Sequence, residues 1–414
     1  NYPSANSMQS GTITRHLIIA GRVQGVGYRY YLSYKARQFH VTGWVRNRAD
    51  GSVEGLACGD APALDLVATL LAGGRASRLY RAVRDRRLAA AISAWNYTPT
   101  DLGVFRVHAT ARPERAASAL RAAWDQVRRV CDGETREPDV ERVRRVTLAH
   151  WLRRLDTAEG QANHLAAWEL SGGWAAGGAY LDRLLTTDAA GATDVARRWL
   201  AVDRAAVLVY RPSTQRPFAD DAPAVGALLA GDRPEPVEPV TVPTPAAVLR
   251  GGARAWRVER RDGDATVYRT GAGVPLVVAR APGAIAHLGW YIHGGATAER
   301  DDNAGITSLM VRTALRGTAR RSAKQLAEDV EFAGGVVGGG AGADGFQWTI
   351  AVPVDRLDAA AELLADIVQR PAFRDDAVES ERAVALADLA KPERAANAAV
   401  VLLQWLADRA GASA

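Results

Sequence analysis

The sequence is poor in cysteine and lysine and has no long apolar run, and each scarcity excludes a class of protein. Cys58 and Cys131 are the only cysteines and lie far apart, which excludes a disulfide framework and a cysteine-based zinc module. A reducing compartment, the cytoplasm, is therefore the expected location. No apolar run approaches the roughly eighteen residues of a membrane span, and the N-terminus lacks the zones of a signal peptide. We expect no membrane association.

The chain also lacks a strong excess of one charge. Its 414 residues hold 52 basic and 46 acidic side chains, a net charge of +6, and all basic residues except Lys35, Lys324 and Lys391 are arginine. An excess this small, scattered along the chain, argues against a nucleic-acid partner. Apolar residues make up 48% and charged residues 24%, as in ordinary folded proteins, and the length indicates more than one domain.

Proline divides the chain. Eight of the eighteen prolines lie between Arg211 and Pro245, where they remove backbone donors and favour an extended form. We therefore predict the following organisation: a leader or disordered tail over 1–8, domains over 9–60, 61–211 and 251–414, and a Pro-rich linker over 212–250. Apolar spacing predicts helices over 28–39, 64–71, 77–86, 113–130, 307–315, 323–333, 354–368 and 377–390. It predicts strands over 12–21, 41–47, 52–58, 103–111, 205–210, 266–268, 274–280, 285–292 and 346–353. The fold class is α+β.

A glycine-rich loop joins the first predicted strand to the first predicted helix. In Gln24-Gly25-Val26-Gly27-Tyr28 the two glycines let backbone N–H groups converge at a helix N-terminus, which suits a phosphate or carboxylate without a metal. Arg29, in the first turn of that helix, adds a donor able to bind the same anion through two hydrogen bonds.

This loop is part of a compound signal. Gly21-Arg-Val-Gln-Gly-Val-Gly-Tyr-Arg29 is followed by Gly43-Trp-Val-Arg-Asn-Arg-Ala-Asp-Gly-Ser-Val-Glu-Gly55. Together they resemble the two signature motifs of the acylphosphatase family. The resemblance implies that residues Gln24, Gly25, Val26, Gly27 and Tyr28 cradle the phosphate, that Arg29 binds it, and that Asn47 orients the attacking water. It also implies hydrolysis of small acyl phosphates with no cofactor.

The acylphosphatase resemblance covers only residues 9–60. The ferredoxin-like βαββαβ fold of that family needs a second helix and a fourth strand. Residues 61–71 can supply the helix, but the segment after them reads as helix again, over 74–83. We therefore expect a truncated sheet beneath an intact pair of motifs.

The remainder resembles the pitrilysin/insulinase family of zinc peptidases with an inverted motif. Residues 63–84 and the chain as far as Tyr210 are similar to the non-catalytic subdomain, and residues 273–414 to the metal-bearing subdomain type. Landmarks of the second are Gly294-Gly-Ala-Thr-Ala-Glu299 and Arg316-Gly-Thr318. The resemblance implies two α+β sandwich subdomains, and the order of the segments is typical of a fusion.

The zinc motif of that family, H-x-x-E-H, is degenerate here. Ser308 and Arg312 stand in place of the two histidines, and Val311 in place of the glutamate. Zinc needs imidazole, thiolate or carboxylate donors, and a guanidinium repels it. Asp388, in the third-ligand region, is one carboxylate only. We expect no zinc.

The motifs are compatible with two functions and argue against a third. The first is a metal-independent acylphosphatase-type hydrolase carried on an inactive peptidase-like scaffold. The second is a non-catalytic peptidase-family subunit that binds a peptide, or a zinc-bearing peptidase half in trans. The third, a zinc peptidase formed by this chain alone, conflicts with the lost ligands.

Overall fold

The computed structural model describes residues 13–19, 23–32, 42–50, 52–59, 61–97, 104–170, 173–211, 214, 217–219, 221–231, 233–243 and 256–389. Runs of strands and runs of helices follow one another along the chain, and the strand pairs are antiparallel, so the predicted α+β class is confirmed. Two compact units are present. The first comprises Asn1–Ile285 with Glu331–Gly334, and the second Ala286–Val330 with Gly335–Ala414.

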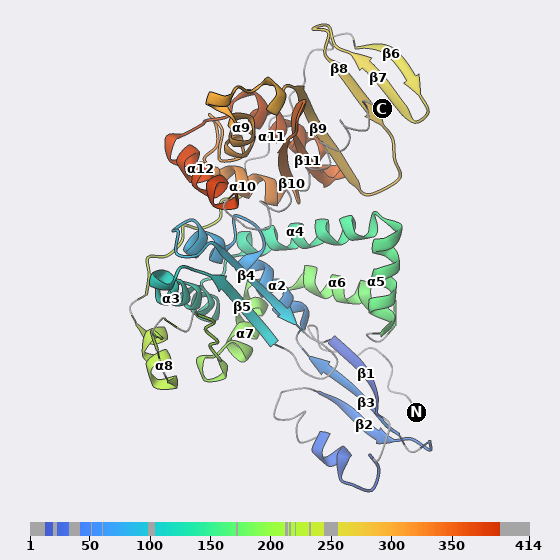
Figure 1. The fold of residues 1–414 in the computed structure, drawn as a ribbon. Coiled ribbons are helices and arrows are strands. Elements are labelled where there is room, and N and C mark those ends of the chain that lie inside the picture. Colours follow the sequence, from blue (N-terminus) through green and yellow to red (C-terminus); the bar gives the residue numbers. More distant parts are fainter. Residues whose placement is uncertain are drawn as a thin grey trace, which may run out of the picture. The chain divides into compact units, whose positions relative to one another are not determined.

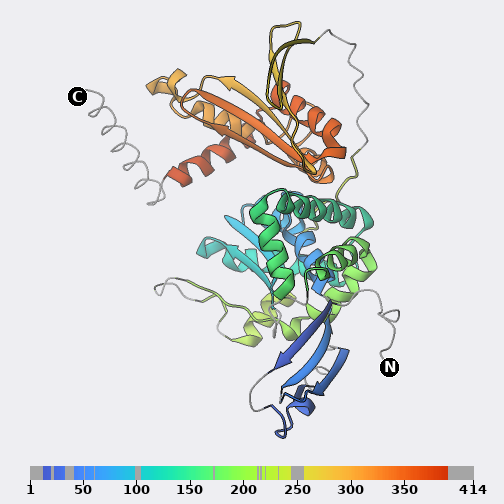
Figure 2. The ribbon, with the colours of Figure 1, turned by 90° about the vertical axis from the view of Figure 1, so that its right-hand side faces the viewer.

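The N-terminal segment is a three-stranded antiparallel sheet of β1 (Ile13–Ile19), β2 (Thr42–Asn47) and β3 (Val53–Gly59) in the order β1-β3-β2 (Figures 1 and 2). All three strands were predicted. The predicted helix over 28–39 begins at Tyr28, and its residues beyond 32 lie outside the described part of the chain. Val53 pairs with Ile19 on one side and with Asn47 on the other. The last residues of β1 and β2 therefore lie at the same end of the sheet.

Helix α2 (Ala61–Ala72) belongs to a second core. Its residues Leu66, Val67, Leu70 and Leu71 have no exposed surface and share one helical face. That face packs with strand β4 and helices α4, α6 and α7. The helix proposed above as the missing element of the N-terminal fold is thus built into the next core.

The elements of this part of the chain, some of which form the second core, follow α2 in sequence (Figure 1). They are η2 (Tyr80–Arg84, a π-helix), β4 (Ala91–Tyr97), β5 (Val104–Thr110), α3 (Pro113–Cys131), α4 (Glu137–Leu155), α5 (Ala158–Leu170), α6 (Ala176–Thr186), α7 (Ala189–Trp199), η3 (Val202–Arg204) and α8 (Ala222–Ala230). Strands β4 and β5 form an antiparallel hairpin.

Three features of this region differ from the sequence predictions. Residues 205–210, predicted as a strand, form none; Leu208 and Tyr210 are almost wholly exposed, because an apolar run becomes a strand only beside a partner. Strand β4 was not predicted, since Ala91-Ile-Ser-Ala-Trp-Asn-Tyr97 alternates weakly. The segment predicted as a linker contains helix α8, which Asp221 caps by accepting from the Ala224 N–H at 2.8 Å.

The chain after the proline-rich segment forms two further sheets. The strands are β6 (Arg257–Asp262), β7 (Ala265–Arg269) and β8 (Pro275–Ala279), which form one antiparallel meander, and β9 (Ile285–His293), β10 (Val336–Ala341) and β11 (Gly345–Pro353), in the order β10-β11-β9. The helices are η4 (Ala296–Ala298), η5 (Asp301–Asn303), α9 (Ile306–Ala314), α10 (Ala323–Phe332), η6 (Val354–Arg356), α11 (Leu357–Gln369) and α12 (Asp375–Leu389). Arginine-rich β6 and glycine-rich β10 were not predicted, because neither alternates apolar with polar residues.

Candidate active site

The loop after β1 is shaped by two glycines. Gly25 and Gly27 have φ of 74° and 75°, in the region that side chains with L chirality rarely adopt. A Cβ placed on either residue would meet nothing within 4 Å, so conformation and not space requires glycine there. The helix then begins at Tyr28, and the Tyr31 N–H donates to the Gly27 carbonyl at 3.0 Å. The result is an exposed glycine loop directly before a helix start, a place whose free backbone N–H groups suit an anion.

Gln24 fastens this loop to the turn between β2 and β3. Its side-chain amide nitrogen donates to the carbonyl oxygens of Arg48 and Ser52, both at 2.8 Å. The amide has two hydrogens, so both are engaged. Any contribution of Gln24 to anion binding therefore comes from its backbone N–H. Because Arg48 follows Asn47 directly, the glycine loop and Asn47 lie at the same end of the sheet.

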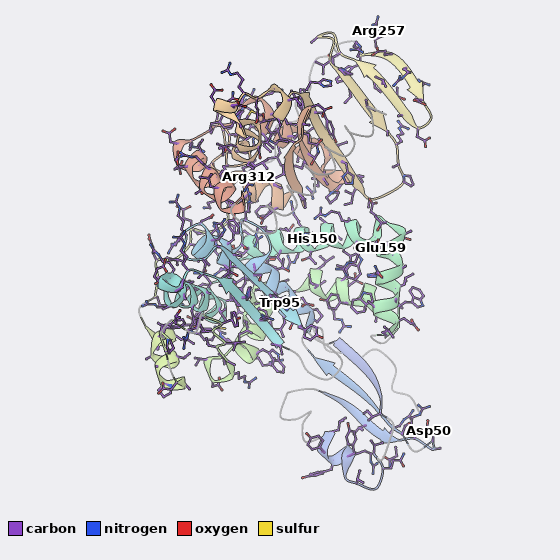
Figure 3. The ribbon with its side chains drawn as sticks, in the orientation of Figure 1. Asp50, Trp95, His150, Glu159, Arg257 and Arg312 are labelled. Carbon is purple, nitrogen blue, oxygen red and sulfur yellow. The ribbon has the colours of Figure 1, made fainter. Side chains whose placement is uncertain are left out.

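The β2–β3 turn carries its own hydrogen-bond set. The Ser52 N–H and hydroxyl donate to Asp50 Oδ1 at 2.9 and 2.5 Å, and the Arg48 N–H donates to the Ser52 carbonyl at 2.9 Å. The hydrogen bonds from the Ser52 hydroxyl and N–H hold the pKa of Asp50 below its ordinary value. Asp50 marks the tip of this turn in Figure 3. A fixed turn here gives Gln24 rigid acceptors.

The two residues expected to perform chemistry are accessible. Arg29, in the first helical turn after the loop, and Asn47, the last residue of β2, are both exposed, while Tyr28 is half-buried. Val26, between the two glycines, is 52% exposed. Their roles in binding remain predictions, but the elements that bear them converge on one end of the sheet.

The degenerate zinc positions lie on helix α9 (Figure 3). Ser308 is exposed, and Val311 is buried with 1% of its surface exposed. The indole N–H of Trp348, on β11, donates to the Val311 carbonyl at 3.1 Å. The position expected for the glutamate of the motif is therefore a packed core position.

The guanidinium of Arg312, the third of these positions, forms an ion pair with a glutamate. Its Nε donates to Glu381 Oε2 at 3.0 Å, and Arg316 donates to Glu381 Oε1. Glu381, on α12, is only 4% exposed. Burial raises its pKa, but the two guanidinium groups outweigh burial and hold the pKa below its ordinary value. Glu381 is therefore a buried, paired carboxylate, although the sequence alone is typical of a solvated helix charge.

No cluster of three or more histidine, cysteine, aspartate or glutamate side chains suited to a metal ion occurs in the described ranges. Asp388 lies in α12, and its side chain is outside the described residues. Within those same ranges no helix is long and apolar enough to cross a bilayer.

Three family models match separate stretches of the chain. Residues 15–84 match acylphosphatase, residues 56–147 match the inactive domain of peptidase family M16, and residues 276–408 match insulinase of family M16. The acylphosphatase match runs beyond the boundary near residue 60 drawn from the motifs, and it overlaps the second match across α2 and η2.

Individual proteins are similar to parts of the chain. An acylphosphatase from Acidiphilium cryptum is 57% identical over 53 residues, 13% of this chain and 58% of the relative's length. One from Nitrobacter hamburgensis is 49% identical over 79 residues, 19% of this chain and 79% of its own length. A protease structure from Helicobacter pylori has a TM-score of 0.33 and 22% identity, over 34% of this chain and 35% of that one.

Proposed function

The chain belongs to the acylphosphatase family through its N-terminal segment and carries peptidase family M16 domains in the remainder, and from this premise we propose that it hydrolyses acyl phosphates without a metal ion. The substrate is a small carboxylic–phosphoric anhydride. The M16 domains act as a scaffold without zinc chemistry.

The proposed chemistry needs charge stabilisation and positioning more than a strong base. The loop amides of residues 24–28 and the guanidinium of Arg29 hold the phosphoryl oxygens. Asn47 holds a water molecule whose oxygen attacks phosphorus. The bond between phosphorus and the acyl oxygen breaks, the carboxylate leaves with the electron pair, and the water proton passes to a phosphoryl oxygen. A carboxylate is a good leaving group, so no acid is needed.

One observation carries this proposal. The side-chain amide of Gln24 donates hydrogen bonds to the carbonyls of Arg48 and Ser52, and these bonds join the glycine loop to the turn that follows Asn47. A phosphate loop without a fixed water-binding residue would bind anions only. A shared hydrogen-bonded frame supports a reaction site.

The direct test is hydrolysis of benzoyl phosphate in the presence of a chelator. We expect activity in the wild type and its loss in Arg29→Ala, because removing a charged phosphate contact that strengthens in the transition state costs on the order of 3 kcal/mol, over a hundredfold in rate. Arg115→Ala, an exposed arginine on α3, is the matched control. Equal rates in wild type and Arg29→Ala, with both chains folded, would reject the proposal.

A second candidate, a subunit that binds a peptide or a zinc-bearing half without cleaving anything, is favoured by one surface. Around the end of α5, Leu165, Leu170 and Trp174 are 50%, 90% and 65% exposed. Leu165 and Trp174 line an open hollow of about 530 Å³. Exposed apolar groups gathered in one place favour a partner. Binding of an apolar model peptide to wild type but not to Trp174→Glu, with the peptide left intact, tests it.

A further inference from the structure

The proline-rich segment lies on the first unit as an extended strap, residues 233–240 (Arg233-Pro-Glu-Pro-Val-Glu-Pro-Val240). Pro234 and Val237 are half-buried and Val240 is 5% exposed, whereas the residues between them are exposed. Val237 packs against the core that contains α2. Burial at every third residue is the period of a polyproline II helix. The side chains of Pro234, Val237 and Val240 are thus the ones that face the protein.

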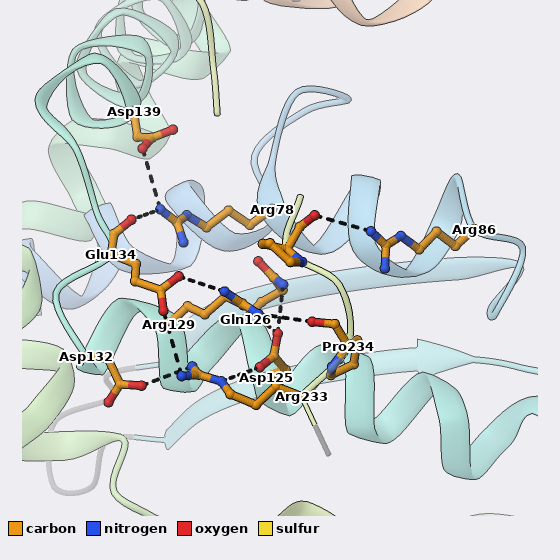
Figure 4. A network of polar contacts seen from close by, with 11 residues as sticks. Arg78, Arg86, Asp125, Gln126, Arg129, Asp132, Glu134, Asp139, Arg233 and Pro234 are labelled. Atoms are coloured by element: carbon orange, nitrogen blue, oxygen red, sulfur yellow. Dashed lines mark hydrogen bonds and ion pairs between the residues drawn. The ribbon is translucent and has the colours of Figure 1, made fainter. Parts of the chain in front are cut away.

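Four arginines hold the backbone of the strap. Each donates a guanidinium N–H to a strap carbonyl, and the carbonyls belong to every second residue. The pairs are Arg129 with Pro234 (3.0 Å), Arg86 with Pro236 (3.4 Å), Arg81 with Glu238 (2.6 Å) and Arg136 with Val240 (3.0 Å). Figure 4 shows the contacts of Arg129 and Arg86. The arginines come from η2, the turn after it, α3 and the residue before α4.

This mode of recognition suits proline. Proline lacks the backbone N–H but keeps its carbonyl oxygen. A surface that donates hydrogen bonds only to backbone carbonyls therefore accepts proline at any position. A chain already restrained to the polyproline II form also loses little entropy on binding. The backbone contacts do not distinguish one side chain from another, so preference for particular side chains arises at the inward positions, those of Pro234, Val237 and Val240.

An acidic group receives the first residue of the strap. Arg233 Nε lies 2.9 Å from Asp125 Oδ1, its Nη2 lies 3.0 Å from Asp132 Oδ2, and its Nη1 lies 3.7 Å from Glu134 Oε1 (Figure 4). Asp125 is 2% exposed, so this anchor includes a buried carboxylate. The site therefore binds the strap in one chain direction. The acidic group pairs with the basic residue at the N-terminal end of the strap, and the four arginines bind the carbonyls that follow it.

We propose that the four-arginine row and the acidic group form a binding groove for an extended, proline-containing peptide of another protein. The recognised pattern is a basic residue followed by Pro-x-Pro-Val-x-Pro-Val. The chain's own strap occupies the groove in cis and must be displaced. This inference is independent of the acyl phosphate site, because no residue is shared between the two.

The test opens the groove while keeping the full chain. Residues 233–243 are replaced by glycine and serine at equal length, and binding of a fluorescein-labelled peptide of residues 233–240 is followed by anisotropy. We expect saturable binding to this open variant and binding at least about tenfold weaker to the wild type, because a tethered strap competes at high local concentration. A peptide that begins with Glu should bind about tenfold less well than one that begins with Arg.

Controls separate the groove from adventitious binding. Arg129→Ala in the open variant should reduce affinity, and Arg115→Ala, an exposed arginine on the same helix, should not. If the open variant does not fold, Val240→Asp in the intact strap removes the buried anchor and the same assay applies. Absence of binding to a folded open variant overturns the proposal. So does a wild-type dimer that becomes monomeric in the open variant, because the straps would then be exchanged between two copies.

Discussion

Arg312 Nε lies 3.0 Å from Glu381 Oε2, at the position that the sequence predicts for the second histidine of a zinc motif. Arg316, two residues beyond the end of α9, donates to the other oxygen of the same carboxylate. The locus is therefore an ion cluster of two arginines and one glutamate that links α9 and the residues just after it to α12. A buried carboxylate with two cationic partners is a structural element, and losing one partner leaves charge unpaired.

The first prediction concerns acid. The pKa of Glu381 is lowered in the folded protein, so its stabilising contribution is present above the unfolded value near 4.5 and is lost as pH falls through the folded value. The protection of the α12 peptide against hydrogen exchange, taken relative to the intrinsic exchange rate at each pH, should fall steeply below about pH 4.5 in the wild type. Glu381→Gln should show faster exchange already at pH 7 and a flatter pH profile. Equal profiles would contradict the role of the cluster.

The second prediction concerns zinc. The purified chain should hold no stoichiometric zinc by elemental analysis after dialysis against the metal, because Arg312 places a permanent positive charge at the motif. One tightly held zinc per wild-type chain would show that ligands lie elsewhere.

The third prediction treats Gln24 as a positioning residue. Gln24→Ala removes both bonds to the β2–β3 turn, so Asn47 should no longer be fixed relative to the loop. We expect kcat to fall by about tenfold or more, and phosphate inhibition to change little, because the backbone amides remain. In a double-mutant cycle, Gln24→Ala should cost little more in an Asn47→Ala background. Additive losses would argue against positioning.

The fourth prediction concerns loop conformation. Gly25→Ala should weaken phosphate binding, because an L residue at φ of 74° costs roughly 1–2 kcal/mol even where its Cβ meets nothing. Gly178→Ala is the control. Gly178 lies in helix α6 with free space around its Cβ, so alanine there should be neutral or stabilising by up to about 1 kcal/mol. Calorimetric titration with inorganic phosphate compares the two.

Local patterns in the sequence predicted the elements that carry the candidate site. The alternation of residues in 12–21, 41–47 and 52–58 predicted three strands, and the structure contains them as β1, β2 and β3. Gly25 and Gly27 predicted the loop that joins β1 to the following helix. Periodicity likewise located α9 and α11, because their buried faces repeat at helical spacing.

Properties that depend on a distant partner were not predictable. Residues 205–210 have strand composition but no neighbouring strand, and the burial of Glu381 depends on two arginines some seventy positions earlier. The strap is the same case: its prolines indicated a linker, and the carbonyl contacts to Arg129 and Arg136 appear only once the chain is folded.

The handedness of the anion loop has a consequence for synthesis. Gly25 and Gly27 hold positive φ, the backbone conformation that L residues avoid, and nothing lies within 4 Å of where an L residue's Cβ would stand. A D-alanine prefers the positive φ that an L-alanine avoids. A semisynthetic chain with D-alanine at either position should keep the loop conformation while giving up the conformational freedom of glycine in the unfolded chain. The same loop would then be stabilised by chirality alone.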